Sequence, residues 1–210
     1  MRTPWVVGIS GASGTPYARS VLRGLLAAGE AVDLVVSRAA RLTLLDETGV
    51  VWRDDPAQVA QWLEGPADPD VRLWPAADLA AGPSSGSYPA RGMIVVPAST
   101  EAVAGIALGL SKDLLQRSAA VTLKEGRPLV VVPREMPLAR PTLVHMLALH
   151  DAGAIVAPAS PGFYAGARDA EALADFVAAK VLDAVGVEHQ LMRRWTGQLG
   201  AARNNDSRAD

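Results

Sequence analysis

Four short runs of mostly β-branched apolar residues constrain the fold of this 210-residue chain more than any other feature. They cover Trp5–Ile9, Val32–Val36, Met93–Pro97 and Leu129–Pro133, and a weaker fifth run covers Ala154–Pro158. Strands that are apolar on both faces are typical of a parallel sheet that helices cover on both sides. We therefore expect an α/β fold with a mainly parallel sheet.

Helical patterns fill most of the gaps between these runs. Apolar residues recur at helical spacing in Tyr17–Ala28, Thr100–Leu110, Lys112–Leu123, Pro141–Asp151 and Glu171–Val185. The least regular section, residues 50–89, is expected to hold a short helix at Ala57–Leu63, a strand near Val71–Trp74 and long loops. This alternation favours a doubly wound sheet. We expect residues 1–196 to form one domain and the polar residues 197–210 to form a frayed tail.

Composition excludes several classes of function. The formal net charge of −2 offers no basic surface for a nucleic-acid partner. No window reaches the roughly 18 continuous apolar residues of a membrane span, and the first apolar run resembles a core strand more than a signal peptide. The chain has no cysteine, which excludes disulfides and thiolate chemistry. We expect a cytoplasmic protein without a membrane partner.

The end of the first strand and the loop after it carry glycines at 8, 11 and 14, with serines between them at 10 and 13. A dinucleotide-binding turn requires G-x-G-x-x-G and an acidic residue about 20 positions later. The glycine spacing here is different, and the second strand ends in Ser37-Arg38, so NAD binding is disfavoured. Backbone N–H groups and hydroxyls at a helix N-terminus suit one phosphate group. A tight turn that needs small residues is the structural alternative.

Polar residues follow two further strands, at the edge where ligands bind in open α/β sheets. Ser99 and Thr100 follow the central strand, where either could cap the next helix or contribute to a site. Arg134 and Glu135 follow the next strand and stand between two prolines. Two opposed charges at such a place favour a ligand-binding role.

Arg117 and Lys124 lie seven residues apart, so both can project from one face of a helix. They could hold an anion there, or Lys124 could only complement the helix dipole. The three histidines at 145, 150 and 189 show no metal-ligand spacing, and no G-x-S-x-G nucleophile motif is present.

Seven motifs together resemble the UbiX-type flavin prenyltransferases, within the flavoprotein superfamily. In order they are GISGASG from Gly8, Ser37-Arg-Ala-Ala40, Ser84-Ser-Gly-Ser87, Leu123-Lys-Glu125, Pro133-Arg-Glu-Met-Pro137, Pro161-Gly-Phe-Tyr164 and Arg194-Trp195. Their order and spacing match over residues 5–195. Each motif alone is weak, and the ordered set is specific.

The resemblance implies a flavodoxin-like Rossmann fold, a three-layer α/β sandwich that usually assembles as a homododecamer with active sites between subunits. It also implies the reaction. Family members transfer the dimethylallyl group of dimethylallyl phosphate to N5 and C6 of reduced FMN without a metal. The prenylated FMN then serves a UbiD-type decarboxylase.

The resemblance also implies roles for individual residues. The expected FMN contacts are Gly11, Ala12, Ser13, Ser37, Ser99, Thr100, Glu101, Ala102 and Arg134. The expected contacts to the prenyl phosphate are Arg117, Lys124, Tyr164 and Lys180. Glu47, Lys124, Glu135 and Trp195 are the expected catalytic residues. Carboxylates suit proton transfer, cations suit a leaving phosphate, and an indole face suits an allyl cation.

This chain departs from the family pattern at a few positions. Many members have Lys and Thr where this sequence has Glu101 and Ala102, and Arg is frequent where it has Lys180. Two alternative functions are an FMN-binding accessory protein without prenyl transfer and an FMN-dependent cysteine decarboxylase. The second alternative lacks support here, since those enzymes use a cysteine and an early histidine, and the first histidine of this chain is His145.

Overall fold

In this computed structural model, which describes residues 2–65, 69–163 and 166–195, the chain forms a three-layer α/β sandwich around one parallel sheet. The strand order is β3-β2-β1-β4-β5-β6. The strands are β1 (Trp5–Ile9), β2 (Val32–Val36), β3 (Val71–Pro75), β4 (Gly92–Ala98), β5 (Leu129–Pro133) and β6 (Ile155–Val156). The expected α/β flavodoxin-like Rossmann architecture is thus confirmed.

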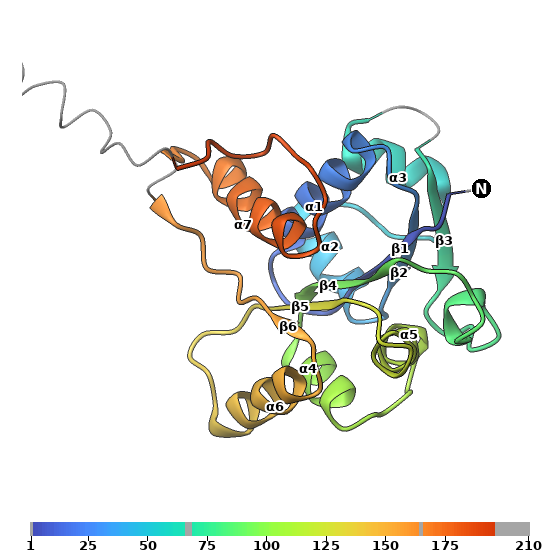
Figure 1. Cartoon of the computed structure of the whole chain (residues 1–210). Helices are drawn as coiled ribbons and strands as arrows, with labels where there is room; N and C mark the ends of the chain where they lie inside the picture. Colours follow the sequence, from blue (N-terminus) through green and yellow to red (C-terminus); the bar gives the residue numbers. More distant parts are fainter. Residues whose placement is uncertain (1, 66–68, 164–165, 196–210) are drawn as a thin grey trace, which may run out of the picture.

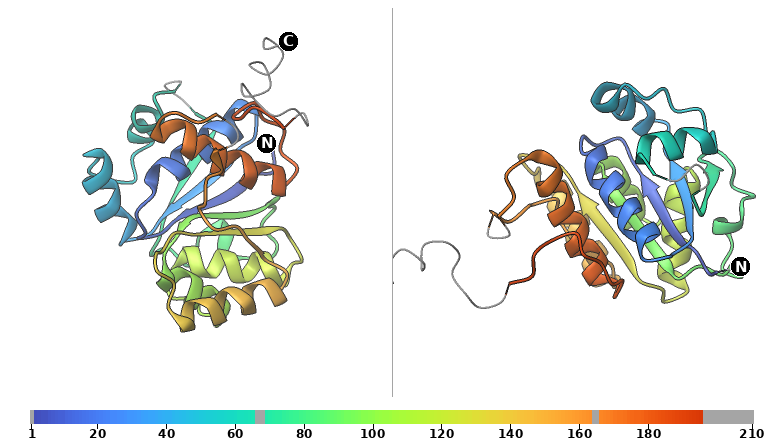
Figure 2. Two further views of the ribbon diagram at one scale, coloured as in Figure 1. Left: turned by 90° about the vertical axis from the view of Figure 1, so that its left-hand side faces the viewer. Right: turned by 90° about the horizontal axis from the view of Figure 1, so that it is seen from above.

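Helices cover both faces of the sheet (Figures 1 and 2). One face carries α1 (Thr15–Ala27), α2 (Ala40–Thr48), α3 (Pro56–Leu63) and α7 (Ala170–Ala184). The other face carries α4 (Thr100–Ala107), α5 (Leu114–Lys124) and α6 (Arg140–Asp151), and a short 3-10 turn, η1 (Gly82–Ser84), lies beside α5. The two layers bury two separate apolar clusters, one on each side of the strands.

Successive side chains along each strand contribute alternately to these two clusters. In β1, Val7 and Ile9 face the layer of α1, whereas Val6 faces the layer of α5. Because successive side chains of a strand point to opposite faces, a strand between two helical layers must be apolar throughout. All five residues of β1, β2 and β5 are buried, including Asp33. This pattern produced the runs from which the sheet was predicted.

The predicted elements agree with the structure within a few residues, with two differences. The fifth apolar run, expected at Ala154–Pro158, forms only the two-residue strand β6. Helix α2 was not predicted. Only Ala40 and Leu44 are buried in it, while Leu42 and Leu45 are 71% and 46% exposed, so its sequence carries no helical apolar stripe.

The strand order reverses between β1 and β4. These strands are neighbours in the sheet, although residues 10–91 of the chain lie between them. Where the connections from two neighbouring strands leave in opposite directions, open α/β sheets commonly bind ligands outside the carboxyl ends of the strands. The loop after β1 and the start of α4 after β4 lie at this switch point. It is the position where an α/β sheet of this order binds its ligand.

Candidate active site

Ser10 joins the two loops at the switch point. Its hydroxyl donates to the Pro97 carbonyl at 2.8 Å and accepts from the Ser99 backbone N–H at 2.7 Å. The side chain is almost fully buried. One serine therefore holds the end of β1 against the start of α4, which fixes two predicted flavin-binding segments relative to each other.

Glu47, from α2, places its carboxylate on the N-terminus of α1. The Gly14 N–H donates to Oε1 at 2.9 Å, the Thr15 N–H donates to Oε2 at 2.8 Å, and the Thr15 hydroxyl donates to Oε2 at 2.7 Å. The sequence predicted an anion at this turn, and here that anion is the chain's own carboxylate. Gly14, at φ 121°, adopts a conformation that favours glycine.

The surroundings of Glu47 favour its ionised form. Burial by itself would raise its pKa, but hydrogen bonds from the Thr15 and Ser13 side chains and from the Thr15 and Gly14 backbone together lower the pKa below its ordinary value. The positive end of the helix dipole acts in the same direction. At neutral pH the group is therefore a carboxylate.

The remaining predicted flavin contacts converge on the same loop. The Arg134 guanidinium donates from Nε to the Ser13 carbonyl at 2.9 Å, which ties the end of β5 to the opening loop. A Cβ on Gly11 would lie 2.4 Å from the Cβ of Ala39, so Gly11 allows the loop to approach the end of β2. The Ser37 hydroxyl there accepts from the Ala40 N–H at 3.2 Å.

The start of α4 combines a helix cap with an ion pair. The Ser99 hydroxyl accepts from the Ala102 N–H at 3.2 Å, so Ser99 is the N-cap; Thr100 is the first helical residue. The Glu101 carboxylate is 2.6 Å from the Lys112 ammonium. This cation comes from the segment before α5 and was not singled out from the sequence.

A second cluster lies along α5 and the loop beside it. The Arg117 Nε donates to the Ser84 carbonyl at 3.0 Å, and Lys124 pairs with Glu125 beside Gly86. The hydroxyls of Ser85 and Ser87 lie 2.9 Å apart in the same loop. The serine motif at residues 84–87 thus lies beside the two cations that were predicted to bind phosphate.

The Lys124 end of this cluster lies at the opposite ends of the strands from the opening loop. The Pro128 carbonyl, four residues after Lys124, accepts from the Met93 N–H at the amino end of β4. Arg134 follows the carboxyl end of β5, whose five residues span roughly 16 Å. Within one chain, Lys124 and the opening loop are therefore on opposite edges of the sheet.

A third group lies on α7 and the segment after it. Lys180 is ten residues from the start of α7, roughly 15 Å along the helix. Its ammonium is 3.9 Å from Asp183, which also binds Arg194, the residue before Trp195. Trp195 is 56% exposed. Tyr164 lies outside the described residues.

Glu135 is exposed and accepts a hydrogen bond from the N–H of Met136 at 3.0 Å. The structure therefore unites Glu47, Arg134 and the opening loop, with Ser37 and Ser99 at its borders. It separates them from the cations of α5 and from Lys180. The contacts of Glu47 with Gly14 and Thr15, and the bridge by Ser10, were not predicted.

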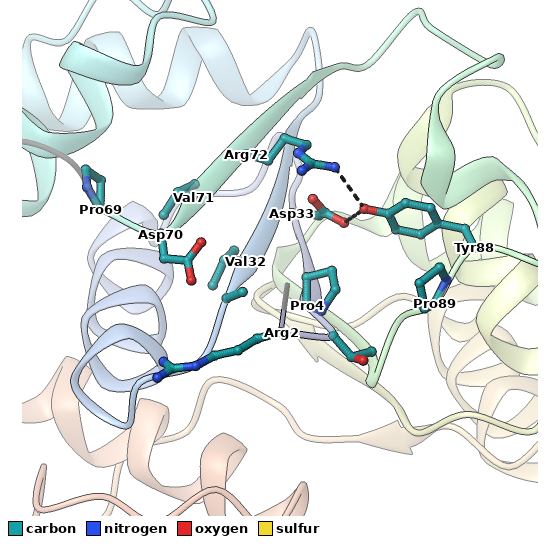
Figure 3. A pocket seen from close by; sticks show the side chains of 12 residues that line it. Arg2, Pro4, Val32, Asp33, Pro69, Asp70, Val71, Arg72, Tyr88 and Pro89 are labelled. Atoms are coloured by element: carbon teal, nitrogen blue, oxygen red, sulfur yellow. Dashed lines mark hydrogen bonds between the residues drawn. The ribbon is translucent and has the colours of Figure 1, made fainter.

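A pocket of about 600 Å³ opens at the amino edge, between the start of β2 and residues 88–89 (Figure 3). No predicted site residue lines it. At its wall, the Tyr88 hydroxyl donates to the buried Asp33 carboxylate at 2.7 Å, and Arg72 lies beside Tyr88. This contact raises the pKa of Tyr88 to about 12, by burial first and then by the hydrogen bond and charge of Asp33. We interpret it as a structural tie between β2 and the connection before β4.

Two kinds of feature are absent from the described residues. In that part of the chain, His, Asp and Glu do not gather in a group of three or more that could hold a metal ion. Likewise, none of its helices is long and apolar enough to cross a membrane.

Comparison with known proteins decides the family. The Flavoprotein family profile matches residues 1–182. Flavin prenyltransferase UbiX of Streptomyces coelicolor is 65% identical over 95% of this chain and 98% of its own length. This chain belongs to the UbiX family of flavin prenyltransferases.

Solved structures agree with this assignment. The crystal structure of AnUbiX (PadA1) in complex with FMN and dimethylallyl pyrophosphate is 36% identical, with a TM-score of 0.84 over 94% of this chain and all of that one. A dodecameric FMN-dependent UbiX-like decarboxylase from Escherichia coli O157:H7 is 39% identical, with a TM-score of 0.82 over 93% of this chain and all of that one. The two alternative functions of this UbiX-family chain, accessory binding and cysteine decarboxylation, are therefore not favoured.

Proposed function

We propose that this chain transfers the dimethylallyl group of dimethylallyl phosphate to N5 and C6 of reduced FMN, and that FMN binds at the carboxyl edge of β1 and β4. The observation that supports this proposal is the pair of hydrogen bonds that the Glu47 carboxylate accepts at the N-terminus of α1. These bonds hold an ionised carboxylate beside the opening loop. We assign this loop to the flavin, with contacts from Gly11, Ala12, Ser13, Ser37, Arg134 and residues 99–102.

The reaction requires proton transfers that these groups can perform. As the carbon–oxygen bond of the donor breaks, phosphate leaves with the bonding electrons, and new bonds form from carbon to N5 and C6. N5 and C6 each lose a proton, and the double bond of the donor takes up one. Glu47 and Glu135 are our candidates for accepting and returning these protons. Lys124, Lys180, Arg117 and Tyr164 are our candidates for stabilising the phosphate, and Trp195 for facing the allyl group.

Completion of such a site needs more than one subunit. Glu47 and Lys124 are at opposite edges of the sheet in one chain, so a site that uses both must take Lys124 from a neighbour. The chain offers an apolar surface for assembly on α6, where Leu143, Val144 and Leu147 are about half exposed. We propose a homo-oligomer, a dodecamer like the E. coli relative, with its active sites at subunit junctions.

We further propose that residues 1–196 form one flavin-binding domain. The product, prenylated FMN, would pass in the cytoplasm to a decarboxylase of the UbiD type.

Product analysis tests the proposal. The purified protein is incubated anaerobically with reduced FMN and dimethylallyl phosphate in the presence of a metal chelator, and the flavin is analysed by mass spectrometry. We expect a flavin that is heavier by one C5H8 unit. Bound FMN of unchanged mass would refute prenyl transfer and favour an accessory flavin-binding role.

A further inference from the structure

Asp183, in the last turn of α7, gathers three basic side chains around one carboxylate. Arg194 donates from Nη2 to Oδ1 at 2.8 Å and from Nη1 to Oδ2 at 3.2 Å. His189 Nε2 is 3.0 Å from Oδ1, and the Lys180 ammonium is 3.9 Å from Oδ2. The hydrogen bond from Arg194 is the main cause that lowers the pKa of Asp183; burial opposes it and His189 adds to it. The group is ionised at neutral pH.

His189 is locked in place between Asp183 and the backbone. Its side chain is only 1% exposed. Its Nδ1 accepts from the Leu191 N–H at 3.3 Å, so in the neutral ring Nε2 carries the hydrogen and donates it to Asp183. Since a buried N–H without an acceptor is costly, Asp183 fixes the ring and, through it, the turn at residues 189–191.

The chain between α7 and Trp195 is also held by packing. Val187 is buried, and Leu191 packs against the core cluster on α1. A Cβ on Gly24 of α1 would lie 2.5 Å from Leu182 and 3.1 Å from Leu191, so the two leucines fit over the bare glycine. This segment is thus docked from Val187 to Leu191. Beyond that point, Arg194 holds the segment through its two hydrogen bonds to Asp183.

One carboxylate therefore determines the surroundings of two residues that we assign to the prenyl donor. It attracts the Lys180 ammonium one turn earlier on α7, and it holds Arg194, which is directly bonded to Trp195. We propose that Asp183 is a positioning residue that orients Lys180 and Trp195 toward the prenyl phosphate. This role rests on the proposed function. It assigns Asp183 no contact with substrate.

Steady-state kinetics of the full-length oligomer test the role. Asp183→Asn keeps the size of the side chain but removes its charge. We expect the KM for dimethylallyl phosphate to rise about tenfold, because a charge-assisted fork and the attraction on Lys180 are lost. The Kd for FMN, measured by flavin fluorescence, is expected to stay within about twofold of wild type, since Asp183 is remote from the opening loop. Asp183→Glu, which keeps the charge, is expected to recover most of the donor affinity.

Controls separate positioning from general stability. Glu171→Gln breaks the exposed pair with Arg23 on the same two helices and is expected to leave both constants unchanged. Arg194→Met, at a side chain 59% exposed, provides a second variant that should fold and should raise the donor KM like Asp183→Asn. Trypsin cleavage after Arg193 or Arg194 is expected to be faster in Asp183→Asn, because the segment is released.

The outcomes are distinct. A donor KM that does not change in Asp183→Asn and Arg194→Met, in an active wild-type background, overturns the positioning role but leaves the proposed function intact. A parallel loss of FMN affinity or of oligomer size also overturns it, since that would show a general structural defect. Wild-type protein that forms no prenylated flavin refutes the proposed function, and this role with it.

Discussion

Replacement of Glu47 by Gln tests the centre of the proposed site. The carboxylate accepts from the Gly14 N–H, the Thr15 N–H and the Thr15 hydroxyl. Gln keeps one acceptor oxygen and so can bind part of this set, but its NH2 group cannot accept from the other donors. The variant is therefore expected to fold, with a weakened α1 N-terminus and without a proton acceptor at this position.

The expected effects differ in size. Hydrogen bonds to a charged group are worth about 1.5–3 kcal/mol and a helix dipole about 0.3–1 kcal/mol, and the exposed position of Glu47 reduces both. We expect the free energy of unfolding at pH 7 to fall by about 1 kcal/mol. Loss of a general acid or base typically lowers rates by about 10²–10⁴, so prenylated-flavin formation is expected to slow at least about 100-fold.

The pH dependence of stability provides a second measurement. The fold lowers the pKa of Glu47, so its stabilisation is complete above the unfolded pKa and is lost as the pH falls through the folded pKa. In urea titrations, the difference between wild type and Glu47→Gln should be largest at pH 7 and should shrink below about pH 5.

The matched control is Asp46→Asn, which removes the neighbouring exposed carboxylate of α2. It is expected to change neither the rate nor the pH profile. A Glu47→Gln variant that makes prenylated flavin at the wild-type rate would refute our assignment of Glu47. If Asp46→Asn slowed the reaction as much as Glu47→Gln, the effect would be due to the overall charge of α2 and not to Glu47 itself.

Three further predictions concern other parts of the molecule. Lys124→Ala should slow product formation. Mixed oligomers of Lys124→Ala and Glu47→Gln subunits should regain activity, because some junctions receive one intact copy of each residue. Mixtures as inactive as their parents would contradict a site between subunits. Tyr88→Phe should lower the free energy of unfolding by about 1–3 kcal/mol, because it removes a hydrogen-bond donor to the buried Asp33. As the pH rises from about 10 toward 12, wild type should lose more stability in denaturant titrations than the variant, since the fold raises the pKa of Tyr88. Gly11→Ala should cost about 1–3 kcal/mol and weaken FMN binding in a fluorescence titration, because the new methyl group meets Ala39; unchanged affinity would place the flavin elsewhere.

The sheet could be predicted because burial on both faces leaves a direct mark on the sequence. β1, β2 and β5 coincide with apolar runs, and all their residues are buried. The partly exposed edge strand β3 gave a weaker signal and was placed only approximately. Helix α2 left no signal, because two of its leucines face solvent. The position of the Glu47 carboxylate depends on that helix, so spacing along the chain could not reveal its contacts.

The separation of Lys124 from the flavin loop, in contrast, could have been deduced from topology. Lys124 precedes β5 and Arg134 follows it, so any parallel sheet that includes this strand puts them at opposite edges. Family resemblance assigned both residues to one reaction and implied a site between subunits. The structure supplies the geometric reason for that implication. The network of Asp183, His189 and Arg194 was not predictable, because it joins a helix end to an irregular segment.

The rigidity of β5 gives this separation a functional consequence. All five residues of the strand are buried, and it pairs with β4 on one side and β6 on the other. A close-packed core of this kind does not deform enough to bring Lys124 to Arg134 within one subunit. Our assignment of FMN to the opening loop and of the leaving phosphate to Lys124 therefore requires that the two contacts come from different subunits. An isolated subunit would keep the carboxyl-edge loop that we assign to FMN but would lack the Lys124 cation that we assign to the leaving phosphate. We therefore expect prenyl transfer to require assembly, and we expect binding of the flavin to its loop to depend on assembly much less.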